Sequence, residues 1–227
     1  MKIIQHDPQE SLYKLCCQIA TAHYKLKEEF SNWSEDDFRM SVYSRCANIV
    51  ESVLFSMIFK KEQLIDKDWY ARIPYIKTPT EAQIHGIIGV FDSHLRVLLV
   101  TGYFASLETF FRILIKQIFP QYSGNKIHKI LEKILDYFDL KDYEHKFNLY
   151  RFIRNSLHNN GIVTDPHAYP ILYNGLWYNT EKGKPIQVNW LMLCQLTAEL
   201  DQCLNKIIHS EKVSSLDVIK DPSFSTG

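Results

Sequence analysis

Apolar residues recur along most of this chain at intervals of three and four positions, the spacing that places them on one face of an α-helix. The first such segment runs from Pro8 to about Phe30, and a proline suits the first turn of a helix. A second begins after Ser34, which is followed by three acidic residues and has the pattern of an N-cap with an acidic first turn. We therefore expect two long helices within residues 1–80.

The central part of the chain has the strongest helical pattern. A helix is predicted from roughly His85 to Phe119, where Pro120 ends it, after a connection over residues 66–83 that holds two prolines. Two further helices are predicted over Asn125–Leu140 and Lys141–His158. We assign residues 81–161 to these core and motif helices.

The pattern changes after residue 170. Residues that favour strands flank the segment Glu181–Lys184, so we interpret residues 170–188 as a small hairpin that turns at that segment. A helix from Trp190 to about His209, within residues 189–210, closes the fold, and residues 215–227 have the composition of a flexible tail. The predicted fold class is all-α: one helical-bundle domain with a small β-hairpin insertion before the last helix.

Composition and charge restrict the function. The 227 residues are 46% hydrophobic, which is enough to bury a substantial core. Lys and Arg together number 26, as do Asp and Glu, so the formal net charge is zero. Without a global positive field, any contact with RNA has to be local.

Cysteine usage and hydropathy favour a cytoplasmic protein without membrane contact. The five cysteines form no CxxC pair and are expected to be reduced, packed thiols. The N-terminus has no apolar secretory stretch. The most apolar segment, Ile87–Val100, is interrupted by Asp92, His94 and Arg96, and we expect a buried core helix rather than a membrane span.

The segment Arg151–Gly161, RFIRNSLHNNG, contains the residues best suited to chemistry. On a helix, Arg151, Arg154, Asn155 and His158 lie on one side. Guanidinium groups bind phosphate oxygens and an imidazole can move a proton near neutral pH, so the group suits phosphodiester cleavage. The alternative is structural: ion-paired arginines and a histidine that caps the helix, where asparagine and glycine end it.

The string RNSLHNNG, late in a helical chain and before a hairpin and a closing helix, resembles the motif region of the HEPN superfamily, in particular its abortive-infection and conflict-system members. The resemblance covers roughly residues 85–210. Members are typically helical bundles that dimerise through their motif helices, so that two Arg-x4–6-His motifs form one composite, metal-independent ribonuclease site. Arg151 lies six residues before His158 and fits this spacing, whereas Arg154 with Asn155 matches the Arg-polar pair that opens the motif. Both arginines are candidates.

The resemblance implies a role for each motif residue. His158 would be the general acid or base, Arg154 and Arg151 would bind the scissile phosphate, and Asn155 would orient the substrate or side chains of the partner. Asn159 and Asn160 are supporting candidates. Asn160 stands where members paired with a nucleotidyltransferase antitoxin carry a tyrosine as a modification target, which disfavours that mode of regulation.

Two other sets of residues allow a functional and a structural interpretation. Glu108 is a candidate supporting carboxylate, buried and paired with a group such as Arg154, or a glutamate at the rim of the core. An aromatic run near two lysines could stack on bases or could pack the hairpin onto the bundle. These residues are Tyr169, Tyr173, Trp177, Tyr178, Lys182 and Lys184.

No cofactor is expected. His85, His94 and His128 are too widely spaced to indicate a metal site, and the phosphate-loop, dinucleotide and serine-hydrolase motifs are missing from the sequence.

The resemblance implies a metal-independent endoribonuclease acting as a homodimer in defence, toxin–antitoxin or stress response, leaving a 2′,3′-cyclic phosphate. RNA, a second copy and an antitoxin or other defence-system protein are the expected partners. The alternatives are a non-catalytic HEPN-like module that binds RNA, a nucleotide or a protein, and a structural scaffold.

Overall fold

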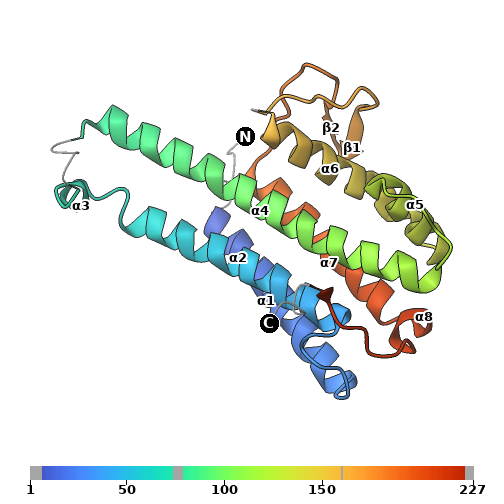
Figure 1. Ribbon diagram of the computed structural model, residues 1–227. Helices are drawn as coiled ribbons and strands as arrows, with labels where there is room; N and C mark the ends of the chain where they lie inside the picture. Colours follow the sequence, from blue (N-terminus) through green and yellow to red (C-terminus); the bar gives the residue numbers. More distant parts are fainter. Residues whose placement is uncertain (1–6, 74–78, 160, 223–227) are drawn as a thin grey trace.

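The computed structural model describes residues 7–73, 79–159 and 161–222 and confirms the predicted fold class (Figure 1). It is a helical bundle with one two-stranded antiparallel hairpin between α6 and α7. The elements in chain order are α1 (Pro8–Glu29), α2 (Phe38–Glu62), α3 (Lys67–Tyr70), α4 (Glu81–Ile118), α5 (Ile127–Tyr137), η1 (Lys141–Tyr143), α6 (Glu144–His158), β1 (Ile171–Tyr173), β2 (Leu176–Tyr178), α7 (Trp190–Ile208) and α8 (Glu211–Ser214).

The antiparallel pair α2 and α4 forms the centre of the bundle. The helices approach closely at Gly102, where a Cβ atom would lie 3.1 Å from the side chain of Ile49. Helices α1 and α7 pack along one side, and α5 and α6 lie against the C-terminal part of α4 (Figure 1). A capping box formed by Thr80 and Gln83 begins α4. The core positions expected from the helical spacing are therefore filled from several helices.

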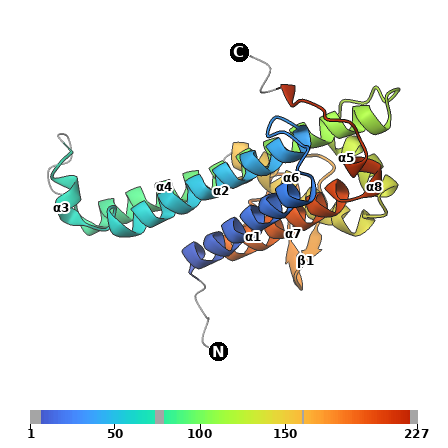
Figure 2. The same ribbon diagram turned by 90° about the horizontal axis from the view of Figure 1, so that it is seen from below.

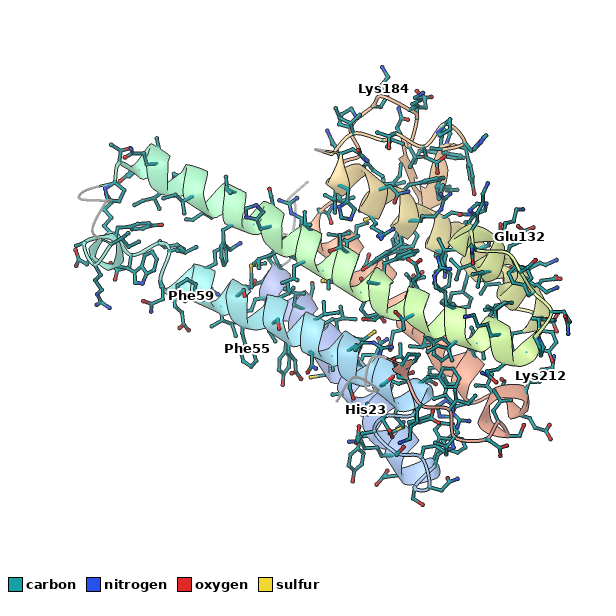
Figure 3. The ribbon with its side chains drawn as sticks, viewed as in Figure 1. His23, Phe55, Phe59, Glu132, Lys184 and Lys212 are labelled. Carbon is teal, nitrogen blue, oxygen red and sulfur yellow. The ribbon has the colours of Figure 1, made fainter. Side chains whose placement is uncertain are left out.

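The end of α2 and the beginning of α4 project beyond the other helices as a two-helix arm with α3 at its tip (Figures 1 and 2). Ile87–Val100, predicted to be a buried core helix, lies partly in this arm. Val90 is 58% exposed and Leu98 41% exposed, whereas Leu95 and Leu99 of the same segment are buried. Phe55 of α2 is 66% exposed and points away from α4 (Figure 3).

Two helices, α2 and α4, are long and apolar enough to cross a membrane by length and composition alone. In their apolar windows, 39% of the residues of α2 and 56% of those of α4 are buried inside the bundle. Core helices of soluble proteins pass the same test, so this is weak evidence for a membrane-spanning segment. The expected absence of membrane contact stays a prediction.

The predicted N-cap of α2 is wrong. Asp37, not Ser34, caps this helix, and its Oδ1 accepts a hydrogen bond from the Arg39 N–H at 2.9 Å. The Ser34 carbonyl instead accepts from the Asp37 N–H at 3.0 Å and forms the turn that precedes the helix. Several consecutive polar residues could have capped the helix. Asp37 is the cap because its carboxylate also binds the buried guanidinium of Arg39.

The C-terminal segment is packed as far as the structure describes it, contrary to the flexible tail predicted for residues 215–227. The Phe38 N–H donates to the Ile219 carbonyl at 2.9 Å, so the segment runs beside the start of α2. Asp221 is fully buried and accepts from Ser41 Oγ at 2.6 Å. Local composition indicated fraying, but partners from α2 hold the segment. Residues 223–227 lie outside the described part of the chain.

The predicted hairpin exists, but its turn lies at Asn174 and Gly175 rather than at Glu181–Lys184. Both turn residues have positive φ, 49° and 75°, which asparagine and glycine tolerate in a two-residue hairpin turn. The Glu181–Lys184 segment instead pairs with Val163, whose N–H donates to the Lys184 carbonyl at 3.0 Å. The Asn-Gly dipeptide was the signal that should have located the turn.

Candidate functional site

Helix α6 carries the motif. Its apolar residues Phe147, Tyr150 and Ile153 are buried in the core, and the ring of Phe147 meets Phe111 of α4 edge to face, 5.6 Å between centroids. This packing leaves Arg151, Arg154, Asn155 and His158, which we call the motif face, half-buried or exposed.

The end of α6 is held by local hydrogen bonds. The Asn159 and Gly161 N–H groups both donate to the Ser156 carbonyl at 2.8 Å, and Gly161 has a φ of 82°. Asn159 Nδ2 donates to the Asn155 carbonyl at 2.6 Å and to Thr164 Oγ1 at 3.2 Å. These contacts match the predicted helix stop and give Asn159 a structural role. Asn160 lies outside the described residues.

Arg151 is tied to the loop that follows α6. Its Nη1 lies 2.7 Å from Asp165 Oδ2, and its guanidinium carbon is 4.5 Å from the centroid of the Phe152 ring. Burial alone would raise the pKa of Asp165, but hydrogen bonds from the His167 N–H and from Arg151 outweigh burial and lower it. The carboxylate therefore neutralises much of the Arg151 charge.

Arg154 is the motif arginine that has no acidic partner. Its guanidinium carbon lies 5.4 Å from the centroid of the Phe104 ring on α4, and the side chain is half-buried. Within the described parts of the chain it forms no ion pair, and its Nε is buried without a hydrogen-bond acceptor. An unpaired, partly desolvated guanidinium is well suited to bind an anion.

His158 is the last residue of α6 and is exposed. It lies one helical turn beyond Arg154, and no hydrogen bond or ion pair to another described residue holds its ring. Asn155 is half-buried beside them. The structure thus brings Arg154, Asn155 and His158 together on one accessible surface, as the helical spacing predicted.

Glu108 does not pair with Arg154. Its Oε1 accepts from Arg112 Nη2 at 2.6 Å and from Nε at 3.0 Å. Arg112 stands four residues later on the same helix, which is the spacing of a local ion pair. Glu108 therefore has a partner of its own at the rim of α4 and does not neutralise Arg154.

One neighbour of the motif face was missed. His128, in the first turn of α5, has a pKa lowered first by burial and next by the charge of Arg151. Sequence distance hid this proximity, because the turn after α5 folds α6 back against it and so brings residues of the two helices together. Among the described residues, the motif face included, no three His, Cys, Asp or Glu side chains lie close enough together to hold a metal ion.

The aromatic run divides between packing and surface. Tyr173 is buried, and the Tyr169 ring packs edge to face on Phe152 at 5.8 Å. Trp177 is 71% exposed, and Tyr178 is half-buried at the wall of a cavity. The packing interpretation describes the first two residues, whereas the last two line the cavity.

Compared with protein-family models, curated proteins and solved structures, the chain matches none of them.

Proposed function

We propose that the motif face is an RNA-binding and RNA-cleaving site and that the protein is a metal-independent endoribonuclease. The observation that carries the proposal is that Arg154, which has no acidic partner among the described residues, lies one helical turn from the exposed His158. The resemblance of RNSLHNNG to HEPN motifs supports it independently.

The chemistry needs few groups. The 2′-hydroxyl of RNA attacks the adjacent phosphorus, a base takes the hydroxyl proton, and an acid protonates the departing 5′-oxygen as the P–O5′ bond breaks. The products are a 2′,3′-cyclic phosphate and a 5′-hydroxyl. Arg154 would bind the phosphate and stabilise the charge that builds up on its oxygens. Asn155 would orient the same phosphate or the ribose.

A single His158 can act as the base or as the acid at one moment, and the reaction uses both. A homodimer in which the motif faces of two copies meet would supply the second imidazole. This arrangement is also the one that the family resemblance implies. A phosphate of RNA bound at this interface would neutralise the half-buried Arg154.

Arg154 is the better candidate for the primary phosphate ligand. Arg151 has the spacing that the family motif favours, but Asp165 already holds its Nη1 at 2.7 Å. A phosphate would have to displace that carboxylate from Arg151, whereas Arg154 has no carboxylate to displace. Arg151 would then position the loop beside the site.

The biological setting follows from the resemblance. Cytoplasmic action in defence, toxin–antitoxin or stress response, with an antitoxin or other defence-system protein as partner, is part of the proposal.

The second candidate is a non-catalytic module that binds RNA, a nucleotide or a protein through the same face. The Arg151–Asp165 ion pair favours it, because this pair removes one of the two cations that the cleavage motif would use. In that case Arg154 and His158 would contribute to binding or dimerisation.

The test is incubation of the full chain with a labelled tRNA pool in EDTA. The wild type is compared with His158→Ala and with His145→Ala, an exposed histidine on the same helix outside the motif face. The proposal predicts that wild type and His145→Ala cut and that His158→Ala does not. If the wild type cuts none of several RNAs, the ribonuclease proposal is wrong and the non-catalytic binding module is the candidate that stands.

A further inference from the structure

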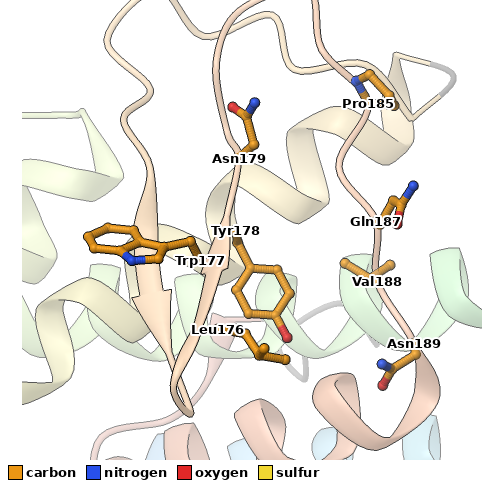
Figure 4. Close-up of a pocket in the computed structure, with 8 residues that line it drawn as sticks. All are labelled: Leu176, Trp177, Tyr178, Asn179, Pro185, Gln187, Val188 and Asn189. Carbon is orange, nitrogen blue, oxygen red and sulfur yellow. The ribbon is translucent and has the colours of Figure 1, made fainter.

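A cavity of about 550 Å³ lies between the hairpin and the segment that leads into α7 (Figure 4). One wall is β2, which pairs only with β1 within the described residues, and the other is Pro185–Asn189. No charged side chain lines the cavity. Its volume is in the range of small-molecule sites, roughly 300–1,000 Å³.

Three amide side chains surround this cavity: Asn179, Gln187 and Asn189. The Oδ1 atoms of the two asparagines accept backbone N–H groups, of Glu181 at 2.9 Å and of Met192 at 2.8 Å. Their Nδ2 groups therefore remain donors. Gln187 is exposed, and neither the oxygen nor the nitrogen of its amide forms a hydrogen bond with another described residue. Amide donors and acceptors of this kind pair with the polar edges of nucleobases.

The ring of Tyr178 lies between the two walls of the cavity (Figure 4). It is half-buried, and burial raises the pKa of its hydroxyl, so the group is a neutral donor at physiological pH. An aromatic ring next to amide groups can stack on a planar base while the amides contact the base edge.

The loop that joins the two walls carries two lysines and one glutamate, Glu181, so its net charge is +1. Lys182 and Lys184 are both exposed, and neither forms an ion pair with a described residue. Lys184 points outward at the tip of this loop (Figure 3). A neutral, aromatic and amide-lined cavity, with two lysines in the loop that joins its walls, fits a base and its phosphate better than it fits an uncharged sugar or an apolar peptide.

We propose that this cavity binds one unpaired nucleotide, with its base against Tyr178, its base edge on the amides, and its phosphate facing Lys182 and Lys184. A free mononucleotide and a nucleotide within single-stranded RNA offer the same chemistry. The choice of RNA as the source rests on the proposed function.

The test measures binding by the full-length His158→Ala chain, which keeps the RNA intact. AMP and UMP are titrated by calorimetry, and a short labelled oligouridine by fluorescence anisotropy, both in EDTA. Gln187→Ala should weaken binding about tenfold, the lower part of the range for losing contacts to a base. Gln202→Ala, an exposed glutamine on α7 outside the cavity, is the matched control and should bind normally.

The lysines are tested by salt dependence. Replacing Lys182 and Lys184 together by Gln should reduce the slope of log affinity against log salt, because fewer counterions are released. Lys25→Gln, an exposed and unpaired lysine on α1, is the control and should leave the slope unchanged.

Each result has one meaning. Binding of a mononucleotide, weakened by Gln187→Ala, supports the proposal with a free nucleotide as ligand, and binding of the oligouridine alone supports it with RNA. Binding of neither probe, or equal binding by Gln187→Ala and Gln202→Ala, overturns it. Cleavage is measured separately. If the wild type does not cut RNA but Gln187→Ala weakens nucleotide binding, the ribonuclease proposal is refuted and the nucleotide-binding proposal stands.

Discussion

Two arginine sites in this molecule use the same side chain in opposite ways. Arg39, at the start of α2, is fully buried, and all five of its N–H donors have acceptors: both carboxylate oxygens of Asp37 at 2.8 Å, and the carbonyls of Val213, Leu216 and Asp217. Its guanidinium carbon also lies 3.7 Å from the Trp33 ring centroid. Arg154, on α6, is half-buried and has no acidic partner among residues 7–73, 79–159 and 161–222.

The difference indicates which arginine is structural and which is available. A guanidinium whose donors are all occupied joins elements together, and here Arg39 joins the start of α2 to the segment after α7. A guanidinium with an aromatic neighbour and no anion has donors left for a ligand. The predictions below test this contrast, from the largest expected effect to the smallest.

Replacing His158 by Ala should reduce the rate of RNA cleavage by about 100-fold or more, the usual contribution of a general acid or base. Because the side chain is exposed and unpaired, the free energy of unfolding should change by less than about 1 kcal/mol. Single-turnover cleavage assays and urea denaturation measure the two quantities. Loss of cleavage together with a large loss of stability would indicate a structural histidine instead.

Replacing Arg39 by Met should lower the free energy of unfolding by about 3–5 kcal/mol, because it leaves the buried Asp37 carboxylate without its cation. The segment 213–222 should become accessible at the same time. Urea denaturation and hydrogen exchange in that segment are the measurements. A loss below about 1 kcal/mol would show that Arg39 is not the residue that holds the segment.

Replacing Arg154 by Met should weaken RNA binding or cleavage about tenfold or more, since a charge-assisted hydrogen bond contributes about 1.5–3 kcal/mol. The free energy of unfolding should stay within about 1 kcal/mol of the wild type, because the described contact that is lost is the cation–π contact with Phe104. Arg72→Met, an exposed arginine near the tip of the arm, is the control. If Arg154→Met destabilises the protein but binds RNA normally, Arg154 is a structural arginine like Arg39.

A buried acid without a cation extends the contrast. Asp201 is 1% exposed, and burial raises its pKa to about 6, although Gln18 and Tyr103 act in the opposite direction. Gln18 Nε2 donates to its Oδ2 at 2.8 Å. Below the unfolded pKa, near 3.8, the group is protonated in both states and has no effect; as pH rises to about 6 the folded state is progressively disfavoured.

Asp201→Asn should therefore stabilise the protein more at pH 8 than at pH 5, with a difference of about 1–2 kcal/mol between the two. Urea denaturation of both proteins at each pH measures it. A gain that is the same at the two pH values would show that the Asp201 carboxyl does not titrate between them.

The smallest effect is expected at Asp165. Asp165→Asn removes the carboxylate charge from an ion pair whose side chains are 16% and 13% exposed, and because Asn can still accept a hydrogen bond, a loss of about 1 kcal/mol of stability is expected. It also frees Arg151, so RNA binding should strengthen by a few-fold and depend more steeply on salt. Adding Arg151→Met should abolish this gain. A gain that survives the second substitution would mean that Arg151 does not reach the RNA.

Local rules were enough to predict the helices. The boundaries of α1, α4 and α7 lie within a few residues of those expected from apolar spacing, because a helix depends on contacts three and four positions away. The end of α6 followed from Asn159 and Gly161 in the same way. The hairpin turn at Asn174 and Gly175 was also local, and the error there was the choice of the wrong glycine-containing segment.

The sequence by itself determined the helical class, the order of elements and the common face of Arg151, Arg154 and His158, since these follow from residue type and helical period. Only the tertiary structure decided which arginine is neutralised. Asp165 reaches Arg151 from the loop after α6, while Glu108 pairs with Arg112 and leaves Arg154 without a carboxylate. Ion pairs and burial depend on distances between segments, and residues up to 178 positions apart meet at Arg39, which no local periodicity encodes.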